Sequence, residues 1–188
     1  MIRRRMPQRD QGRRFFVALP ISRTLQEEML RWEMQYTNLP VRWLTGKNLH
    51  VTLIPPWHTE DDTETRELLA DASGTPATIP LAFNRVAFGP DPASPRLIWA
   101  EGETPSELVT LRDRIAETLT IAPERKLFRL HLTLARFREE AFGSFPIRKL
   151  NERVDWKDVA RSFVLMESHL SPRGADYEIL ATFPLGHV

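Results

Sequence analysis

The sequence contains no cysteine, and this absence removes several kinds of chemistry at once. Without thiols the chain has no disulfide bonds, no cysteine nucleophile and no cysteine-based zinc site. No apolar run approaches the roughly 18 residues that a membrane-spanning helix needs. The basic start, MIRRRMPQRDQGRR, also lacks the apolar stretch of a secretory signal. We therefore expect a soluble, cytoplasmic protein that does not bind a membrane.

The charge is small overall but unevenly distributed. The net charge is +1, and residues 1–14 hold six arginines and one aspartate, a balance of +5, which leaves +1 minus +5, or −4, for the remainder. An arginine-rich arm can bind a phosphate backbone, but a short terminal run is more often a solvated tail. We expect residues 1–13 to form a flexible basic arm. Residues 14–188 fit one two-lobed domain, since no linker-like stretch divides them.

Apolar patterns and turn residues divide the chain into two rounds of strand, helix and strand, one in each half. Such a pattern predicts an α+β protein of two lobes in which each half contributes a sheet. We expect capping boxes at Thr24 with Glu27 and at Thr104 with Glu107, and a strand that ends at Pro55-Pro56. Strands are expected at 13–21, from 49 onward, at 78–88, 96–101 and 126–137, and in a closing hairpin of 161–170 and 177–185; helices are expected after Thr24, at 63–73 and after Thr104.

One short motif occurs twice. LHVTL occupies residues 49–53 and LHLTL occupies residues 130–134, so the histidines at 50 and 131 lie 81 positions apart in a chain with five histidines. Side chains alternate across a strand, so each histidine shares a face with the threonine two residues later while the leucines point the other way. If the two halves are related by a pseudo-twofold axis, both polar pairs converge on one cleft.

Two facing imidazoles suit acid–base chemistry, because imidazole titrates near neutral pH. One neutral ring can take a proton from water while the other, protonated, gives a proton to a leaving oxygen. The hydroxyls of Thr52 and Thr133 can donate hydrogen bonds to a phosphate between them, and Arg136 can add a permanent positive charge. Phosphoryl transfer needs little beyond positioning and charge stabilisation, so a metal is not obligatory.

Other uses of these residues have less support. A single histidine on a strand is more often structural, but two copies in matching context favour function. A zinc site lacks a convincing third ligand, since His58, His169 and His187 have no metal-like spacing to either motif. No Gly-x-Ser-x-Gly elbow indicates a serine hydrolase. Aromatic side chains can stack on a terminal base, although core packing is the commoner role for the candidates, which are Phe15, Phe16, Trp43, Trp57 and Trp99.

These residues resemble a known family. Paired His-x-Thr strands about 80 residues apart are similar to those of the two-histidine phosphoesterase superfamily. The nearest branch is the bacterial RNA 2′,3′-cyclic phosphodiesterases, also called 2′-5′ RNA ligases. The likeness extends from RRFFVALP to YEILATFPL and includes NLHVTLIPPW, PRLIWAE, LHLTLARF and MESHLSPRGADYEIL. IPPW differs from the commonest ending of the first motif in this family. The four His and Thr positions are intact, so the difference affects the expected cleft wall and, through it, the expected nucleotide preference.

The resemblance implies a bilobal α+β fold of two pseudo-symmetric lobes, whose sheets line a central cleft. It implies hydrolysis of RNA 2′,3′-cyclic phosphate ends to a 2′-phosphate without a metal or another cofactor, with reversible 2′-5′ ligation as a back-reaction. His50 takes the place of the general acid, His131 that of the general base, and the threonines and Arg136 those of the phosphate-binding residues. A small cyclic nucleotide or ADP-ribose cyclic phosphate is the alternative substrate, and a non-catalytic RNA- or nucleotide-binding module is the alternative class. We expect a monomer.

Overall fold

The structure of the chain is a computed structural model that describes residues 12–59, 62–73, 77–122, 127–171 and 174–186. Three α-helices and nine strands lie in these ranges, together with three short 3-10 helices at Met34–Tyr36, Gly46–Asn48 and Glu139–Ser144. The strands are β1 (Arg13–Pro20), β2 (Arg42–Trp43), β3 (His50–Thr59), β4 (Ile79–Gly89), β5 (Leu97–Glu101), β6 (His131–Arg136), β7 (Asn151–Ala160), β8 (Ser162–Ser171) and β9 (Gly174–Pro184); the helices are α1 (Arg23–Glu33), α2 (Asp62–Asp71) and α3 (Ser106–Thr118).

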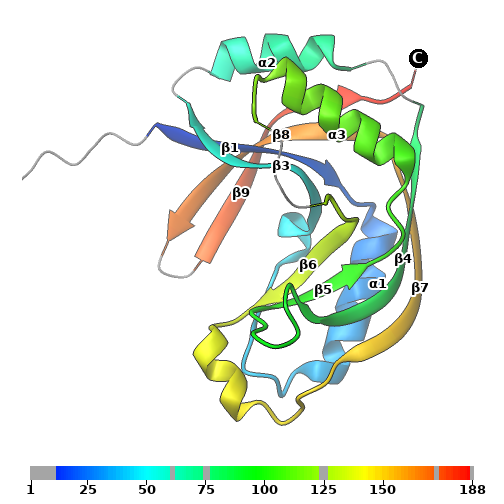
Figure 1. Cartoon of the computed structure of the whole chain (residues 1–188), viewed down its shortest axis with the longest axis vertical. Helices are drawn as coiled ribbons and strands as arrows, with labels where there is room; N and C mark the ends of the chain where they lie inside the picture. The colour runs from blue at the N-terminus through cyan, green and yellow to red at the C-terminus, as the bar shows by residue number, and fades with distance from the viewer. Residues whose placement is uncertain (1–11, 60–61, 74–76, 123–126, 172–173, 187–188) are drawn as a thin grey trace, which may run out of the picture.

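The strands form two curled antiparallel sheets, so the predicted α+β bilobal fold is confirmed (Figure 1). One sheet has the order β3-β1-β8-β9 and the other the order β2-β6-β5-β4-β7. The sequence pattern predicts one sheet from each half of the chain, and this detail is wrong, because the four-stranded sheet combines β1 and β3 with β8 and β9. Strands from both ends of the chain complete the four-stranded sheet, because β8 pairs with β1 in the middle of it.

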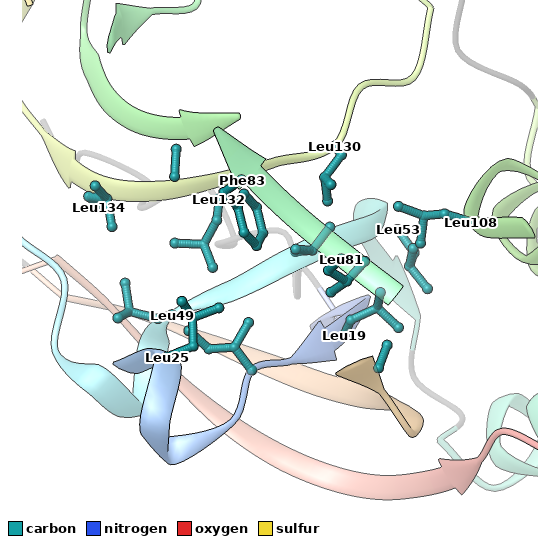
Figure 2. Packing of buried hydrophobic residues seen from close by; sticks show 14 of the residues in the cluster. Leu19, Leu25, Leu49, Leu53, Leu81, Phe83, Leu108, Leu130, Leu132 and Leu134 are labelled. Atoms are coloured by element: carbon teal, nitrogen blue, oxygen red, sulfur yellow. The ribbon is translucent and has the colours of Figure 1, made fainter. Parts of the chain in front are cut away.

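A single buried cluster joins the two sheets. Leu49, Val51 and Leu53 are each no more than 3% exposed, and Leu132 and Leu134 of β6 are fully buried. Figure 2 shows labelled leucines of both motifs pointing into the same apolar region. The predicted leucine faces therefore anchor both motif strands to one core, which fixes the position of their opposite, polar faces.

Both predicted capping boxes are wrong in detail. Helix α1 has Ser22 as its N-cap in place of Thr24, and the Ser22 hydroxyl accepts a hydrogen bond from the Leu25 amide at 3.2 Å. Thr104 does not cap α3. Its hydroxyl instead accepts a hydrogen bond from the Leu130 amide at 2.8 Å, which holds the chain immediately before His131.

Two strand predictions are also corrected. Strand β3 does not end at Pro55-Pro56 but continues to Thr59. The prolines are tolerated because β3 is an edge strand and they lie where its register with β1 shifts, between the pairs Phe15–Trp57 and Val17–Ile54. Strand β7 occupies a stretch that has no clear pattern in the sequence. It lies at the edge of its sheet beside β4, where charged side chains face outward.

The expected basic arm falls mostly on residues 1–11, which lie outside the described residues. Arg13 belongs to β1, and its guanidinium donates hydrogen bonds to both carboxylate oxygens of Glu167, at 3.1 and 2.6 Å. Arg14 follows it on the strand and donates to the Ser168 hydroxyl at 3.1 Å. Within the described ranges, no helix combines the length and apolar character needed to span a membrane.

Candidate active site

The two motif strands come from different sheets and contact each other where the sheets meet. On each strand the histidine and threonine are half-buried, whereas the leucines around them are buried. The alternation predicted for the two motifs is therefore correct. His50 and Thr52 share one face of β3, and His131 and Thr133 share one face of β6.

Both imidazoles are held in the same way by their own backbone. Nδ1 of His50 lies 2.8 Å from the carbonyl oxygen of Asn48, and Nδ1 of His131 lies 2.9 Å from that of Arg129. A carbonyl oxygen can only accept, so Nδ1 is the donor in each bond. Each neutral ring therefore carries its proton on Nδ1 and keeps Nε2 available to accept a proton from another group.

Aromatic rings pack against both histidines. The centroid of the His50 ring lies 5.0 Å from that of Phe16 on β1 and 5.2 Å from that of Tyr177 on β9. The His131 ring has Trp99 on β5 as a neighbour, at 5.0 Å. Phe16 and Trp99 were candidates from the sequence. Both are almost fully buried, and both contact a histidine.

A hollow of about 610 Å³ adjoins His50 and is lined by residues of both sheets. His50, Thr52 and Arg136 are all in its lining, so three of the five predicted site residues meet here. Arg14 and Arg42 add two further guanidinium groups. The remaining lining consists of Phe16, Pro56, Leu170, Ser171, Gly174, Ala175 and Tyr177.

His131 lines a different hollow, of about 470 Å³, which shares no lining residue with the first. The two histidines are nevertheless close enough to influence each other. Burial lowers the pKa of His50 to about 4; the hydrogen bond to the Asn48 carbonyl acts in the opposite direction, and the charges of Arg136 and His131 lower the pKa further. In the free protein at neutral pH, His50 is therefore uncharged.

The β8–β9 hairpin holds the segment before His50 in place. Asp176 forms an ion pair with Lys47 at 2.7 Å, and the side-chain amide of Asn48 donates to the Ala175 carbonyl at 3.5 Å. Gly174 has a φ of +122° and lies directly against Arg42, where a Cβ would collide with the guanidinium. The hairpin thus holds the segment before His50 and leaves room for the Arg42 guanidinium.

Sequence reasoning missed Arg14, Arg42 and Tyr177 as parts of the cleft. They lie on β1, β2 and β9, and they reach the site only through strand pairing between distant parts of the chain. No local spacing marks them. Tyr177 lies within the segment MESHLSPRGADYEIL, which contributed to the family resemblance but had no assigned role.

One group of side chains with metal-ligating atoms exists in the described part of the chain, formed by Glu167, His169 and Glu178. It lies on β8 and β9 and includes neither motif histidine. Both carboxylate oxygens of Glu167 already bind Arg13, whose hydrogen bond is the main reason that the pKa of Glu167 lies below its ordinary value. The group therefore matches a structural ion-pair cluster better than a metal centre.

Comparison with known proteins assigns the family. The profile of the 2′-5′ RNA ligase superfamily matches residues 24–170. The chain belongs to this superfamily. A curated relative from Archaeoglobus fulgidus, named RNA 2′,3′-cyclic phosphodiesterase, is 28% identical over 176 residues, covering 90% of this chain and 99% of the relative. A relative of the same name from Methanocaldococcus jannaschii is 27% identical over 177 residues, covering 89% and 98%.

Solved structures match the fold of this superfamily member over nearly its whole length. The protein TT0787 from Thermus thermophilus aligns with a TM-score of 0.76 at 20% identity, covering 93% of this chain and 100% of that one. LigT from E. coli in its apo form aligns with a TM-score of 0.71 at 20% identity, covering 94% and 99%. LigT has also been solved in complex with 3′-AMP. At 20% identity, the likeness to these structures shows the fold alone.

Proposed function

We propose that this protein hydrolyses the 2′,3′-cyclic phosphate at an RNA end to a 2′-phosphate, without a metal, by acid–base catalysis between His50 and His131. The observation that carries the proposal is the matched pair of histidines, each bonded through Nδ1 to the carbonyl two residues before it. Membership of the 2′-5′ RNA ligase superfamily and the names of the two curated relatives support the reaction class.

In the proposed reaction, Nε2 of His131 takes a proton from water as the water oxygen attacks phosphorus. The bond from phosphorus to the ribose O3′ breaks, and Nε2–H of His50 gives its proton to O3′. The phosphate remains on O2′. Because Nδ1 of each ring is occupied by a carbonyl, Nε2 is the atom left for proton transfer in both cases.

His50 must acquire a proton before it can act as the acid, since its pKa is lowered to about 4 in the free protein. The causes of this low pKa include burial first and the nearby positive charge of Arg136. A bound phosphate anion offsets that charge and adds a negative charge of its own, so substrate binding raises the pKa of His50. Protonation of the acid is thereby coupled to the arrival of substrate.

Thr52, Thr133 and Arg136 are proposed to bind the non-bridging phosphate oxygens. Each threonine lies two residues after its histidine on the same strand face, so its hydroxyl is directed to the same side of the strand. The guanidinium of Arg136 supplies a charge-assisted hydrogen bond and stabilises the charge that develops in the transition state. Arg14 and Arg42, in the lining of the same hollow, favour an anionic substrate.

We further propose that the protein acts as a monomer in the cytoplasm. One chain supplies both histidine motifs, so the reaction needs no residue from a second copy. RNA ends and small nucleotides with a cyclic phosphate share the chemistry that the cleft recognises. Their relative turnover distinguishes an RNA-processing enzyme from one that acts on mononucleotides.

The test uses a short RNA with a 2′,3′-cyclic phosphate, incubated with the protein in EDTA beside the His131→Ala variant and a mononucleotide 2′,3′-cyclic phosphate. We expect a 2′-phosphate product, identified by mass and by phosphatase sensitivity, that the variant does not form. Equal or faster turnover of the mononucleotide would favour the small-nucleotide alternative. Salt-dependent binding of RNA without any product would favour a non-catalytic binding module.

A further inference from the structure

The carbonyl that holds His131 lies on a stretch of irregular chain. Nδ1 of His131 donates to the carbonyl oxygen of Arg129 at 2.9 Å, and residues 127–130, which lead into β6, belong to no strand. A carbonyl outside a sheet has no ladder of backbone hydrogen bonds to fix its direction. The direction of the imidazole therefore depends on what holds the peptide group between Arg129 and Leu130.

A side chain from another part of the fold holds this peptide group. A trans peptide group is planar, and its C=O and N–H point in nearly opposite directions. The Arg129 carbonyl and the Leu130 amide belong to one such group, so a partner of the amide also fixes the direction of the carbonyl. That partner is Thr104, whose hydroxyl oxygen accepts a hydrogen bond from the Leu130 amide at 2.8 Å. The bond also polarises the peptide group, which strengthens its carbonyl as an acceptor.

Thr104 is itself held in place by the backbone around it. It lies half-buried between the end of β5 and the start of α3. Two residues earlier, the Gly102 amide donates to the Leu130 carbonyl at 3.3 Å. Gly102 lies so close to β4 that a Cβ on it would collide with the Ala82 carbonyl oxygen, so only glycine permits this approach. The segment 102–104 therefore binds both the amide and the carbonyl of Leu130.

The first motif has the same arrangement with a different partner. The Asn48 carbonyl accepts from Nδ1 of His50, and the amide of the same peptide group, that of Leu49, donates to the Gly46 carbonyl at 3.2 Å. The backbone of the 3-10 helix at Gly46–Asn48 thus supplies the acceptor. In the second motif a side chain supplies it, so a single substitution can remove it.

We propose that Thr104 is a positioning residue for His131. Its hydroxyl fixes the peptide group between Arg129 and Leu130, and that group holds the imidazole with its proton on Nδ1 and with Nε2 free. The effect on catalysis rests on the proposed function, in which His131 is the base. If the peptide group rotates, the Arg129 carbonyl no longer accepts from Nδ1, and the proton can move to Nε2. A neutral ring protonated at Nε2 has no lone pair there to take a proton from water.

The experiment compares the rates of three variants. Thr104→Val removes the acceptor and keeps the shape of the side chain, whereas Thr104→Ser keeps the hydroxyl. Thr110→Val is the matched control, because the Thr110 hydroxyl is exposed and donates to the Ser106 carbonyl within α3. Single-turnover hydrolysis of an RNA 2′,3′-cyclic phosphate should be about tenfold slower in Thr104→Val, since one hydrogen bond is lost. Thr104→Ser and Thr110→Val should stay within about twofold of wild type.

NMR of the imidazole nitrogens runs in parallel and does not depend on catalysis, because it reports which nitrogen of each neutral ring carries the proton. In the wild type, both His50 and His131 should carry it on Nδ1. Thr104→Val should move the His131 proton toward Nε2. His50 should be unchanged, since the Gly46 carbonyl still holds its peptide group. A hydroxyl that only stabilises the fold would leave the proton of His131 on Nδ1.

Three results would overturn the inference: an unchanged rate in Thr104→Val, a slower Thr104→Val protein whose His131 keeps its proton on Nδ1, or a Thr104→Ser protein as slow as Thr104→Val. If Thr104→Val does not fold, Thr104→Cys takes its place, since sulfur is a weak acceptor. An unchanged rate or an unchanged position of the His131 proton in that variant overturns the inference equally. A proton that moves to Nε2 in a protein that hydrolyses nothing would refute the proposed function and leave the positioning role supported.

Discussion

The two copies of the motif share their local geometry but differ in their surroundings. In both, the histidine bonds to the carbonyl two residues earlier, and the flanking leucines lie in the common core. The first copy lies on an edge strand, with two aromatic rings and a hairpin packed around His50. The second lies on an interior strand between β2 and β5, with the Trp99 ring beside His131.

This difference shows how a repeated motif can place two imidazoles in unlike surroundings. The strand and its carbonyl fix the direction of each imidazole, so that part is the same in both copies. Burial and neighbouring charge then determine its proton affinity, and these are supplied by other elements of the fold. His50 consequently has a pKa of about 4 although its own motif is nearly identical to that of His131.

The largest effects on rate are expected when the imidazole of either motif is removed. His50→Ala and His131→Ala should each lower kcat by about 100- to 10,000-fold, since each removes one proton-transfer group. The double variant should lose less than the product of the two effects, because the pair acts as a unit. Single-turnover rates on a cyclic-phosphate RNA measure this.

His58→Ala is the matched control for both substitutions. His58 lies on the same strand as His50, is exposed, and is not part of the hollow beside His50. Its replacement should leave the rate within about twofold of wild type. A comparable loss in this variant would mean that the rates report damage to β3 rather than loss of an acid or base.

Arg136 distinguishes the two copies in sequence, because Pro55 stands at the matching position five residues after His50. Arg136→Gln should lower kcat/KM by about 10- to 100-fold, since it removes a charge-assisted hydrogen bond to phosphate. Arg138→Gln, two residues farther along and outside the hollow, serves as the control. An unchanged kcat/KM for Arg136→Gln would remove this residue from the proposed site.

The threonines test whether the two copies contribute equally to phosphate binding. Thr52→Val and Thr133→Val keep the shape of the side chain but remove its hydroxyl, and each should lower kcat/KM by about tenfold. Thermal unfolding of both variants checks that the sheets remain intact. A loss confined to one variant would show that only one strand contacts the phosphate.

The smallest expected effect is a change in the titration of His50. NMR of the imidazole signals should give a pKa near 4 for the free protein, and inorganic phosphate should raise it by offsetting positive charge. Arg136→Gln should also raise it, because the charge of Arg136 contributes to the lowering. At a pH slightly above 4, phosphate binding should therefore take up protons, which calorimetry in buffers of different ionisation enthalpy detects. A pKa that phosphate leaves unchanged contradicts the proposed activation of the acid.

The sequence predicts the two polar faces but not the walls around them. Alternation along a strand is a local property, so the directions of His50, Thr52, His131 and Thr133 follow from the motif itself. The contribution of Tyr177 depends on the pairing of β9 with β8 and of β8 with β1. No local pattern encodes that register.

Errors in element boundaries have similar causes. Pro55-Pro56 reads as the end of a strand, since proline cannot donate to a sheet, but an edge position and a register shift accommodate both residues. Thr104 has the sequence context of a helix cap, yet its hydroxyl bonds to the amide of Leu130, 26 residues later. A contact of this kind is visible only once the strands are assembled.

The order of strands in the four-stranded sheet determines when the cleft can form during folding. Strand β1 cannot complete its sheet until β8 is present, and Phe15 pairs with Glu167 across most of the chain. Pairing between such distant segments carries a high loop-closure cost and is characteristic of slow folding. Tyr177 and the hairpin that steadies Lys47 and Asn48 come from β8 and β9, which are synthesised long after His50. On the ribosome, therefore, the first histidine is made well before the segments that complete its environment.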